Sequence, residues 1–172
     1  MGASGWAYFA DYDPDPAKAL EKLRANVFAS GKFGEAHDWE TAVQQMEAML
    51  QDAGPLREIL ERRMKADMER HGGRKPRTIA EALDQAAEEG THSILDIMCG
   101  ISEEPEFATA FPAPDDWLIK AYGTKLPTRE QVESMEFSAA EDLERWSAVF
   151  FPVCETAGGE PRWWRFEGCS GD

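Results

Sequence analysis

The sequence has few of the residues that mark secreted, membrane or metal-binding proteins. Its 172 residues include only three cysteines, Cys99, Cys154 and Cys169, and so sparse and odd a set is a poor disulfide framework. No run approaches the roughly 18 apolar residues that a membrane helix requires. Residues 1–12 lack the basic and apolar regions of a signal peptide. We therefore expect a cytoplasmic protein in a reducing compartment, without membrane contact.

Motifs for metals, phosphates and dinucleotides are missing as well. The chain contains no CxxC, HxxxH or HExxH spacing and no glycine-rich phosphate loop. Asp11, Asp13 and Asp15 superficially suggest calcium, but the glycine and the glutamate of a calcium loop are absent and two prolines constrain the segment. We expect no metal and no cofactor.

Acidic residues are what the chain has in excess. The net charge is −15, and residues 78–144 alone hold sixteen acids against three bases. Only residues 57–77 reverse the sign, with eight bases against four acids at helical spacings that predict internal ion pairs. Such a field disfavours nucleic acid and favours a basic protein partner, which it would steer into contact. The alternative is that the acidity serves solubility alone.

The apolar content of 42% is ample for one core, so residues 1–172 are expected to form a single domain. Residues 6–12 alternate as a strand does, and the next helix is predicted to start at Pro16, with Asp15 as its cap, and to stop at Gly31. Two amphipathic helices within 35–77 predict a helical hairpin, which we interpret as a possible insertion.

The second half of the chain alternates helix signals with strand signals. Predicted helices begin at the capping boxes of Thr78 and Thr128, and another begins at Asp115. A third capping box, at Ser138 and Glu141, predicts helix over 139–145. The strands are expected at 91–98 and in a hairpin of 146–154 with 161–166, and the acidic segment 102–114 is expected to be a loop.

Pro152 and Pro161 cannot donate to a ladder, which predicts a position near a sheet edge for the hairpin. The order of elements indicates an α+β domain, with a mainly antiparallel sheet of about four strands packed with several helices, plus the helical insertion.

Two residues are weak candidates for catalysis. His92 precedes Asp96 by four positions, so in a strand both side chains would share a face, as a general base and its orienting carboxylate do. The alternative is that His92 caps a turn and Asp96 satisfies nearby backbone. Cys99 has no basic neighbour in sequence, and we interpret it as a buried, inert thiol.

A second set of residues is suited to binding a partner. Tryptophan is enriched at the centres of protein interfaces, and carboxylates complement a basic surface. In a strand one of the two adjacent tryptophans must face away from the core, unless helices cover both faces of the sheet. The candidates are Glu103, Glu104, Glu106, Asp115, Asp116, Trp117, Trp163 and Trp164.

Three segments of the chain look similar to a known group of proteins. The opening GWAYFADYDPDPAKALEKLRANVFASGKF, the central TIAEALDQAAEEGTHSILDI and the later PTREQVE resemble a family of small bacterial proteins catalogued as hypothetical. The resemblance spans most of the chain except about 35–72, supports a single domain, and implies no activity. By composition alone, the chain is also similar to small acidic antitoxins and immunity proteins.

Three functional hypotheses follow from the sequence. The first is a non-enzymatic inhibitor of the immunity or antitoxin kind, which blocks a basic partner such as a toxin that acts on nucleic acid. The second is a small hydrolase or transferase that uses His92 and Asp96. The third is a scaffold module without a ligand of its own.

Overall fold

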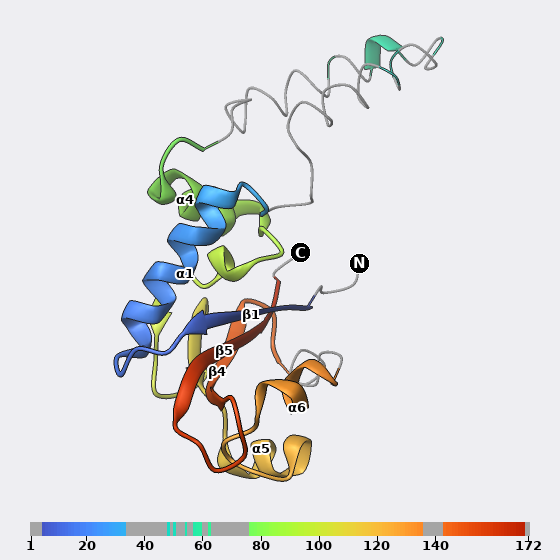
Figure 1. Ribbon diagram of the computed structural model, residues 1–172. Helices are drawn as coiled ribbons and strands as arrows, with labels where there is room; N and C mark the ends of the chain where they lie inside the picture. The colour runs from blue at the N-terminus through green and yellow to red at the C-terminus, as the bar shows by residue number, and fades with distance from the viewer. Residues whose placement is uncertain are drawn as a thin grey trace.

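The computed structural model describes residues 5–33, 76–135 and 143–170, together with positions 48, 50, 54, 57–59 and 62. These residues form a five-stranded mixed sheet in the order β1-β5-β4-β3-β2, with helices on both faces (Figure 1). The strands are β1 (Gly5–Asp11), β2 (Gly100–Ile101), β3 (Thr109–Pro112), β4 (Ser147–Cys154) and β5 (Pro161–Cys169). The helices are α1 (Pro16–Ser30), α4 (Ile79–Glu89), the 3-10 helix η2 (Ile94–Asp96), α5 (Asp115–Tyr122) and α6 (Arg129–Glu133).

The strand directions decide which loops meet. β5 is antiparallel to both β1 and β4, whereas β3 is parallel to both β2 and β4. The prediction of an α+β fold is confirmed, but that of a mainly antiparallel, four-stranded sheet is wrong. The sheet is mixed because α5 and α6 lie between β3 and β4 in the chain. This connection brings the chain back to the end of the sheet where β3 starts, so β4 pairs with β3 in parallel. Four strands thus run one way and β5 alone runs the other.

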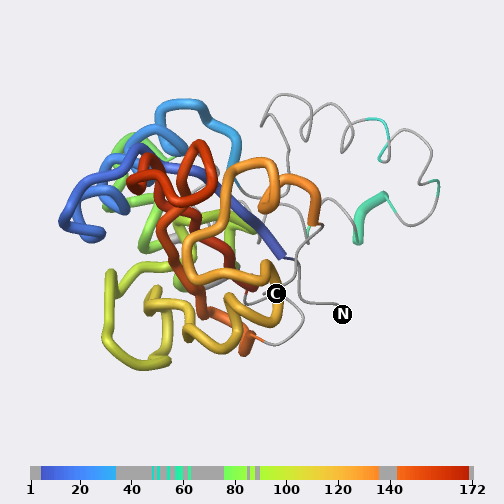
Figure 2. The backbone as a smooth tube through the Cα atoms, turned by 60° about the horizontal axis from the view of Figure 1, so that its bottom comes forward, coloured from blue at the N-terminus to red at the C-terminus, as the bar shows by residue number. Residues whose placement is uncertain are grey.

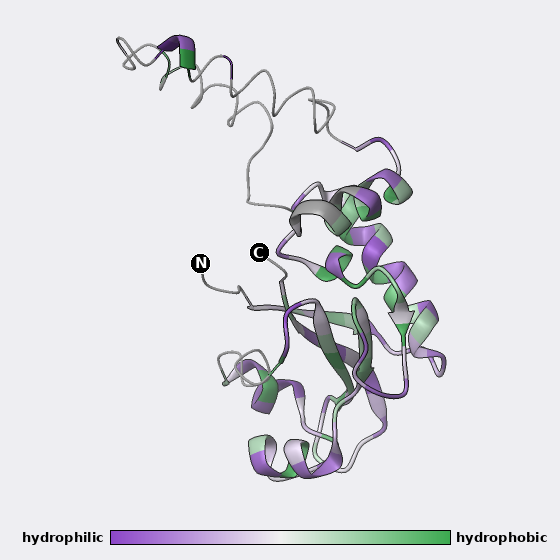
Figure 3. Cartoon of the chain, turned by 180° about the vertical axis from the view of Figure 1, so that it is seen from behind, coloured by the Kyte–Doolittle hydropathy of each residue, from purple (hydrophilic) through white to green (hydrophobic). Residues whose placement is uncertain are grey.

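Each face of the sheet has its own core. On one face α1 and η2 pack around Trp6, Phe150 and Phe166. On the other face, Leu118 of α5 and Val132 of α6 pack against the sheet side chains of a second apolar cluster. Figure 2 shows α1 and the α5–α6 segment on opposite sides of β4 and β5, and Figure 3 shows polar and apolar residues alternating along the helices. Helices on both faces allow the adjacent Trp163 and Trp164 both to contact protein.

Local sequence signals fix the helix ends as predicted. The Asp15 side chain accepts a hydrogen bond from the Ala17 amide, and Gly31 ends α1 in the left-handed conformation at φ 66°. Thr128 and Gln131 form the predicted capping box of α6. At α4, Thr78 caps the Glu81 amide as expected, whereas the Glu81 carboxylate accepts from the Arg77 amide.

Three predictions about strands are wrong. Residues 91–98 form no strand: Ser93 caps the 3-10 helix η2, and the Asp96 carboxylate holds the Thr91 amide, so local side-chain bonds replace a ladder. The expected loop 102–114 contains β3, whose short apolar run is hidden between prolines and acids. The β4–β5 hairpin is central, because β1 pairs with β5 on one side of it and β3 pairs with β4 on the other. Pro152 is tolerated there because it lies beyond the last β4 residue that pairs with β3 and has no ladder bond to lose.

Two predictions fall outside the described residues. The predicted helical hairpin of 35–77 lies almost entirely outside the described residues, and so does the predicted capping box at Ser138 and Glu141.

Candidate functional site

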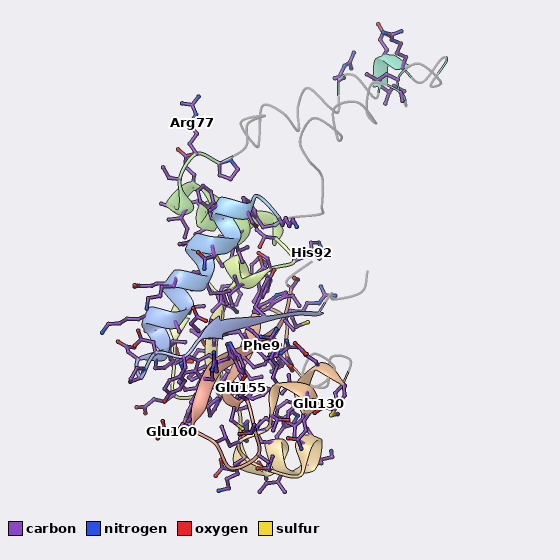
Figure 4. All side chains as sticks on the ribbon, viewed as in Figure 1. Phe9, Arg77, His92, Glu130, Glu155 and Glu160 are labelled. Atoms are coloured by element: carbon purple, nitrogen blue, oxygen red, sulfur yellow. The ribbon has the colours of Figure 1, made fainter. Side chains whose placement is uncertain are left out.

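Exposed and half-buried carboxylates gather at one end of the sheet, which we call the acidic end. β1, β2, β3 and β4 all point their C-termini to this end, and the turn between β4 and β5 lies there too, because β5 runs back from it. Figure 4 shows Glu155 and Glu160 on this turn, and His92 far from them at the opposite end of the sheet. The acidic end comprises Asp11, Asp13, Asp15, Asp115, Asp116, Glu155 and Glu160, whereas β2 stops level with Ala110 and Ala148, well short of it.

Some of these carboxylates have basic partners. Asp13 accepts from Lys22 at 3.1 Å, Glu155 accepts from Arg162 at 2.9 Å, and Asp115 pairs with Lys125. The pKa of Asp13 is lowered, first by the backbone hydrogen bond from Asp15 and then by Lys22.

Within the described part of the chain, three members of the acidic end make no ion pair. All three are exposed. They are Asp11, Asp116 and Glu160. The acidic end therefore keeps a negative excess after its internal pairing.

The three predicted glutamates occupy the loop between β2 and β3, and all are exposed. Ser102 fixes this loop by donating to the Glu104 carbonyl at 2.6 Å. Thr109 donates to the Glu106 carbonyl at 2.9 Å, at the start of β3. Ser102 also bonds to Thr109 at 2.7 Å, so all three glutamates lie near the start of β3 and outside the acidic end.

The predicted tryptophans are more structural than the sequence suggested. Trp164 is only 9% exposed, and its indole N–H donates to the Asp13 carbonyl at 2.8 Å. Trp117 is half-buried against Tyr122 and Phe151 of the second core cluster. Contacts of these side chains with a partner remain predictions, and we leave Trp164 out of the proposed surface because its side chain is buried.

Trp163 belongs to an alternating stack of arginines and aromatic rings, which we call the arginine ladder. Arg162 and Arg129 lie over the Trp163 ring, at 5.4 and 5.1 Å from its centroid. Arg129 and Arg165 each lie 4.6 Å from the centroid of Phe9 on β1. Cation–π attraction orders these side chains on the α6 face of the sheet.

Each arginine of the ladder also pairs with a glutamate. Arg129 pairs with Glu133 and Arg162 with Glu155, both with largely exposed side chains. The third pair, Arg165 with Glu167, is buried at 11% and 3% side-chain exposure and 2.8 Å. Sequence reasoning missed Phe9, Arg129, Arg165 and Glu167, although strand alternation puts Trp163, Arg165 and Glu167 on one face and could have indicated the pair.

Asp96 lies in a buried cluster of hydroxyl groups at the other end of the sheet. One carboxylate oxygen accepts from the Thr91 amide and hydroxyl, and the second accepts from the Ser170 hydroxyl at 2.9 Å. Ser93 completes the cluster through a 2.8 Å bond to Thr91. Burial raises the pKa of Asp96, and the hydrogen bonds only partly offset this effect.

The predicted pair of His92 and Asp96 has a geometry that differs from the expected one. His92 is half-buried and adopts a left-handed backbone conformation at φ 49°, so strand alternation does not relate the two side chains. Asp96 is completely buried with hydroxyl and amide donors on both oxygens. This environment is that of a structural carboxyl, and we build no reaction on it.

Cys99 is exposed, so its interpretation as a buried thiol is wrong. It lies just before the two-residue edge strand β2, which leaves one side uncovered. α1 carries a buried arginine, Arg24, whose pKa is lowered by burial, an effect that electrostatic interactions with Glu21 and Cys99 partly offset. The thiol thus has a basic neighbour that comes from another element and is not adjacent in sequence.

Other site types find no support within the described ranges. They contain no group of three or more metal-ligating side chains, and none of their helices has the length and apolar character to cross a membrane. Comparison of the chain with protein-family models, with curated proteins and with solved structures found no match.

Proposed function

We propose that this chain is a non-enzymatic inhibitor of the antitoxin or immunity kind, which binds a basic protein through its acidic end. The observation that carries the proposal is the convergence of exposed carboxylates from separate connections on one end of the sheet. Segments that are far apart in the sequence contribute to it, so the excess of charge becomes a surface only in the folded chain.

Electrostatics favours such a role. Carboxylates on a shared surface add their fields, and a chain with a net charge of −15 attracts cationic proteins from a distance. Asp116 and Glu160 are the strongest candidates for contact, since both are exposed and lack an ion pair among the described residues. Glu103 and Glu104 lie on a loop fixed by Ser102 outside the acidic end, and contact through them remains a prediction.

The proposed mechanism of inhibition needs no chemistry from this chain. A toxin that acts on nucleic acid holds phosphates with lysine and arginine side chains. Carboxylates that occupy this cationic surface exclude the substrate and complement its charge. The acidic end would thereby compete with the phosphate backbone for the same basic residues.

The test begins with affinity capture of a partner from the native host, followed by measurement of association rates against salt. We expect the double variant Asp116→Lys/Glu160→Lys to slow association by about tenfold at low salt, because steering depends on local charge. The matched control is Asp84→Lys/Glu144→Lys, which changes the net charge equally at exposed positions outside the acidic end.

Two results would count against the proposal. One is an association rate that does not respond to salt. The other is an equal effect of the two double variants, because net charge alone would then explain the binding. Capture of no partner would favour the scaffold hypothesis instead.

A further inference from the structure

The outer edge of β1 carries backbone groups that have no partner in the described structure. β1 is the end strand of the sheet and pairs with β5 on one side only (Figure 1). The Tyr12 amide donates to the Arg162 carbonyl, on the β5 side. Because N–H and C=O groups alternate in direction along a strand, Tyr8 and Ala10 face β5 as well, and Ala7 and Phe9 point their backbone groups outward.

A second hydrogen bond independently supports this alternation of backbone groups that face β5 with groups that point outward. The Trp146 amide donates to the Cys169 carbonyl, so the odd-numbered residues of β5 face β4 and the even-numbered ones face β1. Ala7 and Phe9 therefore lie across from residues of β5 but share no hydrogen bonds with them. In the part of the chain that the structure describes, no other segment bonds to their amides or carbonyls.

β1 lacks four of the features that commonly block an edge strand. Proteins protect edges with lysine, proline, a bulge or a very short strand. The sequence of β1, GWAYFAD, has seven residues without lysine or proline, and its pairing with β5 has no register shift. The opposite edge strand, β2, is protected by its length of two residues. Among the described strands, this contrast makes β1 the edge that is better suited to pair with another strand.

We propose that this edge is a self-association site, at which β1 of a second copy pairs antiparallel about a two-fold axis at Tyr8 and extends the sheet. Tyr8 is the midpoint of Gly5–Asp11, so this register uses the whole strand. It places Ala7 opposite Phe9 of the second copy, and both of these residues direct their hydrogen-bonding groups outward. An isologous contact of this kind closes on itself as a dimer.

The self-complementary register fits a second copy, and the distribution of charge selects the antiparallel direction. Asp11 is the one charged residue of β1, and the register sets it opposite Gly5 of the second copy, so no like charges face each other along the strands. Antiparallel pairing also keeps the two acidic ends at opposite ends of the joint sheet. A parallel arrangement would put them side by side. The acidic ends remain exposed in the pair, so this inference does not depend on the proposed function.

The first test is the molar mass in solution, measured by sedimentation equilibrium from low micromolar to near-millimolar chain concentration. We expect a reversible dimer of twice the 19.2 kDa chain mass. Salt should strengthen it, because salt screens the repulsion between two negative chains. Binding of a basic partner should weaken with salt, so the two proposals can fail separately. A monomer at every concentration and salt would overturn the inference.

The second test is a pair of variants at one position. Ala7→Pro removes an outward amide, and proline is tolerated where the N–H of an edge strand faces solvent. Ala7→Ser keeps the amide and serves as the matched control. We expect a monomer for Ala7→Pro and a dimer for Ala7→Ser. A dimer that survives Ala7→Pro in a folded chain would contradict pairing through β1.

Hydrogen exchange measured by NMR on the unmodified chain decides the question even if Ala7→Pro does not fold. The Ala7 and Phe9 amides should become protected as the concentration rises, because only the second copy bonds to them. The Tyr8 and Ala10 amides bond to β5 within each copy and should show no such dependence. Exchange at Ala7 and Phe9 that is independent of concentration would rule out the second copy as occupant.

Discussion

The Asp96 carboxylate and the Ser170 hydroxyl, 74 positions apart in the chain, are joined by a buried hydrogen bond of 2.9 Å. The bond ties η2 to the residue that follows β5. Through Thr91 it also includes the turn before η2. Both ends of the contact are completely buried, so neither group can exchange its partner for water.

Replacement of Asp96 should reveal how much this cluster contributes. Asp96→Ala leaves the Thr91 and Ser170 donors buried without acceptors, and we expect a loss of about 3 kcal/mol in the free energy of unfolding. Asp96→Asn should cost clearly less, since the amide oxygen can accept from Thr91 and the amide N–H can donate to the Ser170 hydroxyl. Urea denaturation of the two variants measures the difference. Equal losses would indicate that hydrogen bonding at this site contributes little.

The raised pKa of Asp96 predicts a dependence of stability on pH. The folded protein keeps the Asp96 proton at pH values where the unfolded chain, with a pKa of about 3.9, has already released it. The contribution of this group is therefore complete below that pH and declines as the pH rises through the folded pKa. We expect the free energy of unfolding of the wild type, relative to Asp96→Asn, to fall over this interval. A difference that rises with pH would contradict the burial argument.

Gly168 is predicted to resist any larger side chain. A Cβ atom at this position would lie 2.2 Å from Cζ2 of Trp6, an indole that is only 4% exposed. Because β5 is paired on both sides, the backbone cannot move away, and Gly168→Ala should cost about 3 kcal/mol. In the double variant with Trp6→Phe the clashing ring atoms are gone. Calorimetry should then show a loss smaller than the sum of the two single losses.

The buried pair of Arg165 and Glu167 predicts a specific double-mutant result. Arg165→Met leaves the Glu167 carboxylate buried without its cation, and a loss of about 3 to 5 kcal/mol is expected. Among the described residues, the second oxygen of Glu167 has no hydrogen-bond partner, so Arg165 supplies the one hydrogen bond recorded for this carboxylate. Arg165→Met/Glu167→Leu removes both charges and should be more stable than the single variant. A double variant less stable than Arg165→Met would show that the pair contributes beyond mutual neutralisation.

Signals that act within a few residues could be predicted from the sequence. The Asp15 cap, the glycine stops at Gly31 and Gly123, and the capping box at Thr128 all depend on neighbours in the chain. Strand pairing brings together residues that are distant in sequence. β3, four residues long, was missed because its length and flanking prolines resemble those of a loop. The parallel pairing that sets the direction of the sheet was missed with it.

The candidate sites show the same contrast between local features, which could be predicted, and contacts between distant segments, which could not. The exposed residues Asp115 and Asp116 were identified from charge alone. Their convergence with Glu155 and Glu160 could not be, because it depends on which strands run in the same direction. For His92 and Asp96, the expected alternation failed because side-chain bonds to the backbone of Thr91 and Leu95 favoured a 3-10 turn. Hydroxyl and carboxyl side chains so close in sequence form hydrogen bonds to the backbone that compete with the hydrogen bonds of a strand ladder.

The hydrogen bond from the Trp164 indole to the Asp13 carbonyl has a consequence for anyone who redesigns this surface. It fastens the turn that bears two carboxylates to a ring stacked on Tyr12 and packed against Phe150. The outward charges of that turn therefore take their positions from the hydrophobic interior. Substituting the carboxylates should alter the electrostatic potential of this surface and leave its shape intact. Truncating the indole side chain should change the shape of the surface while every charge is retained.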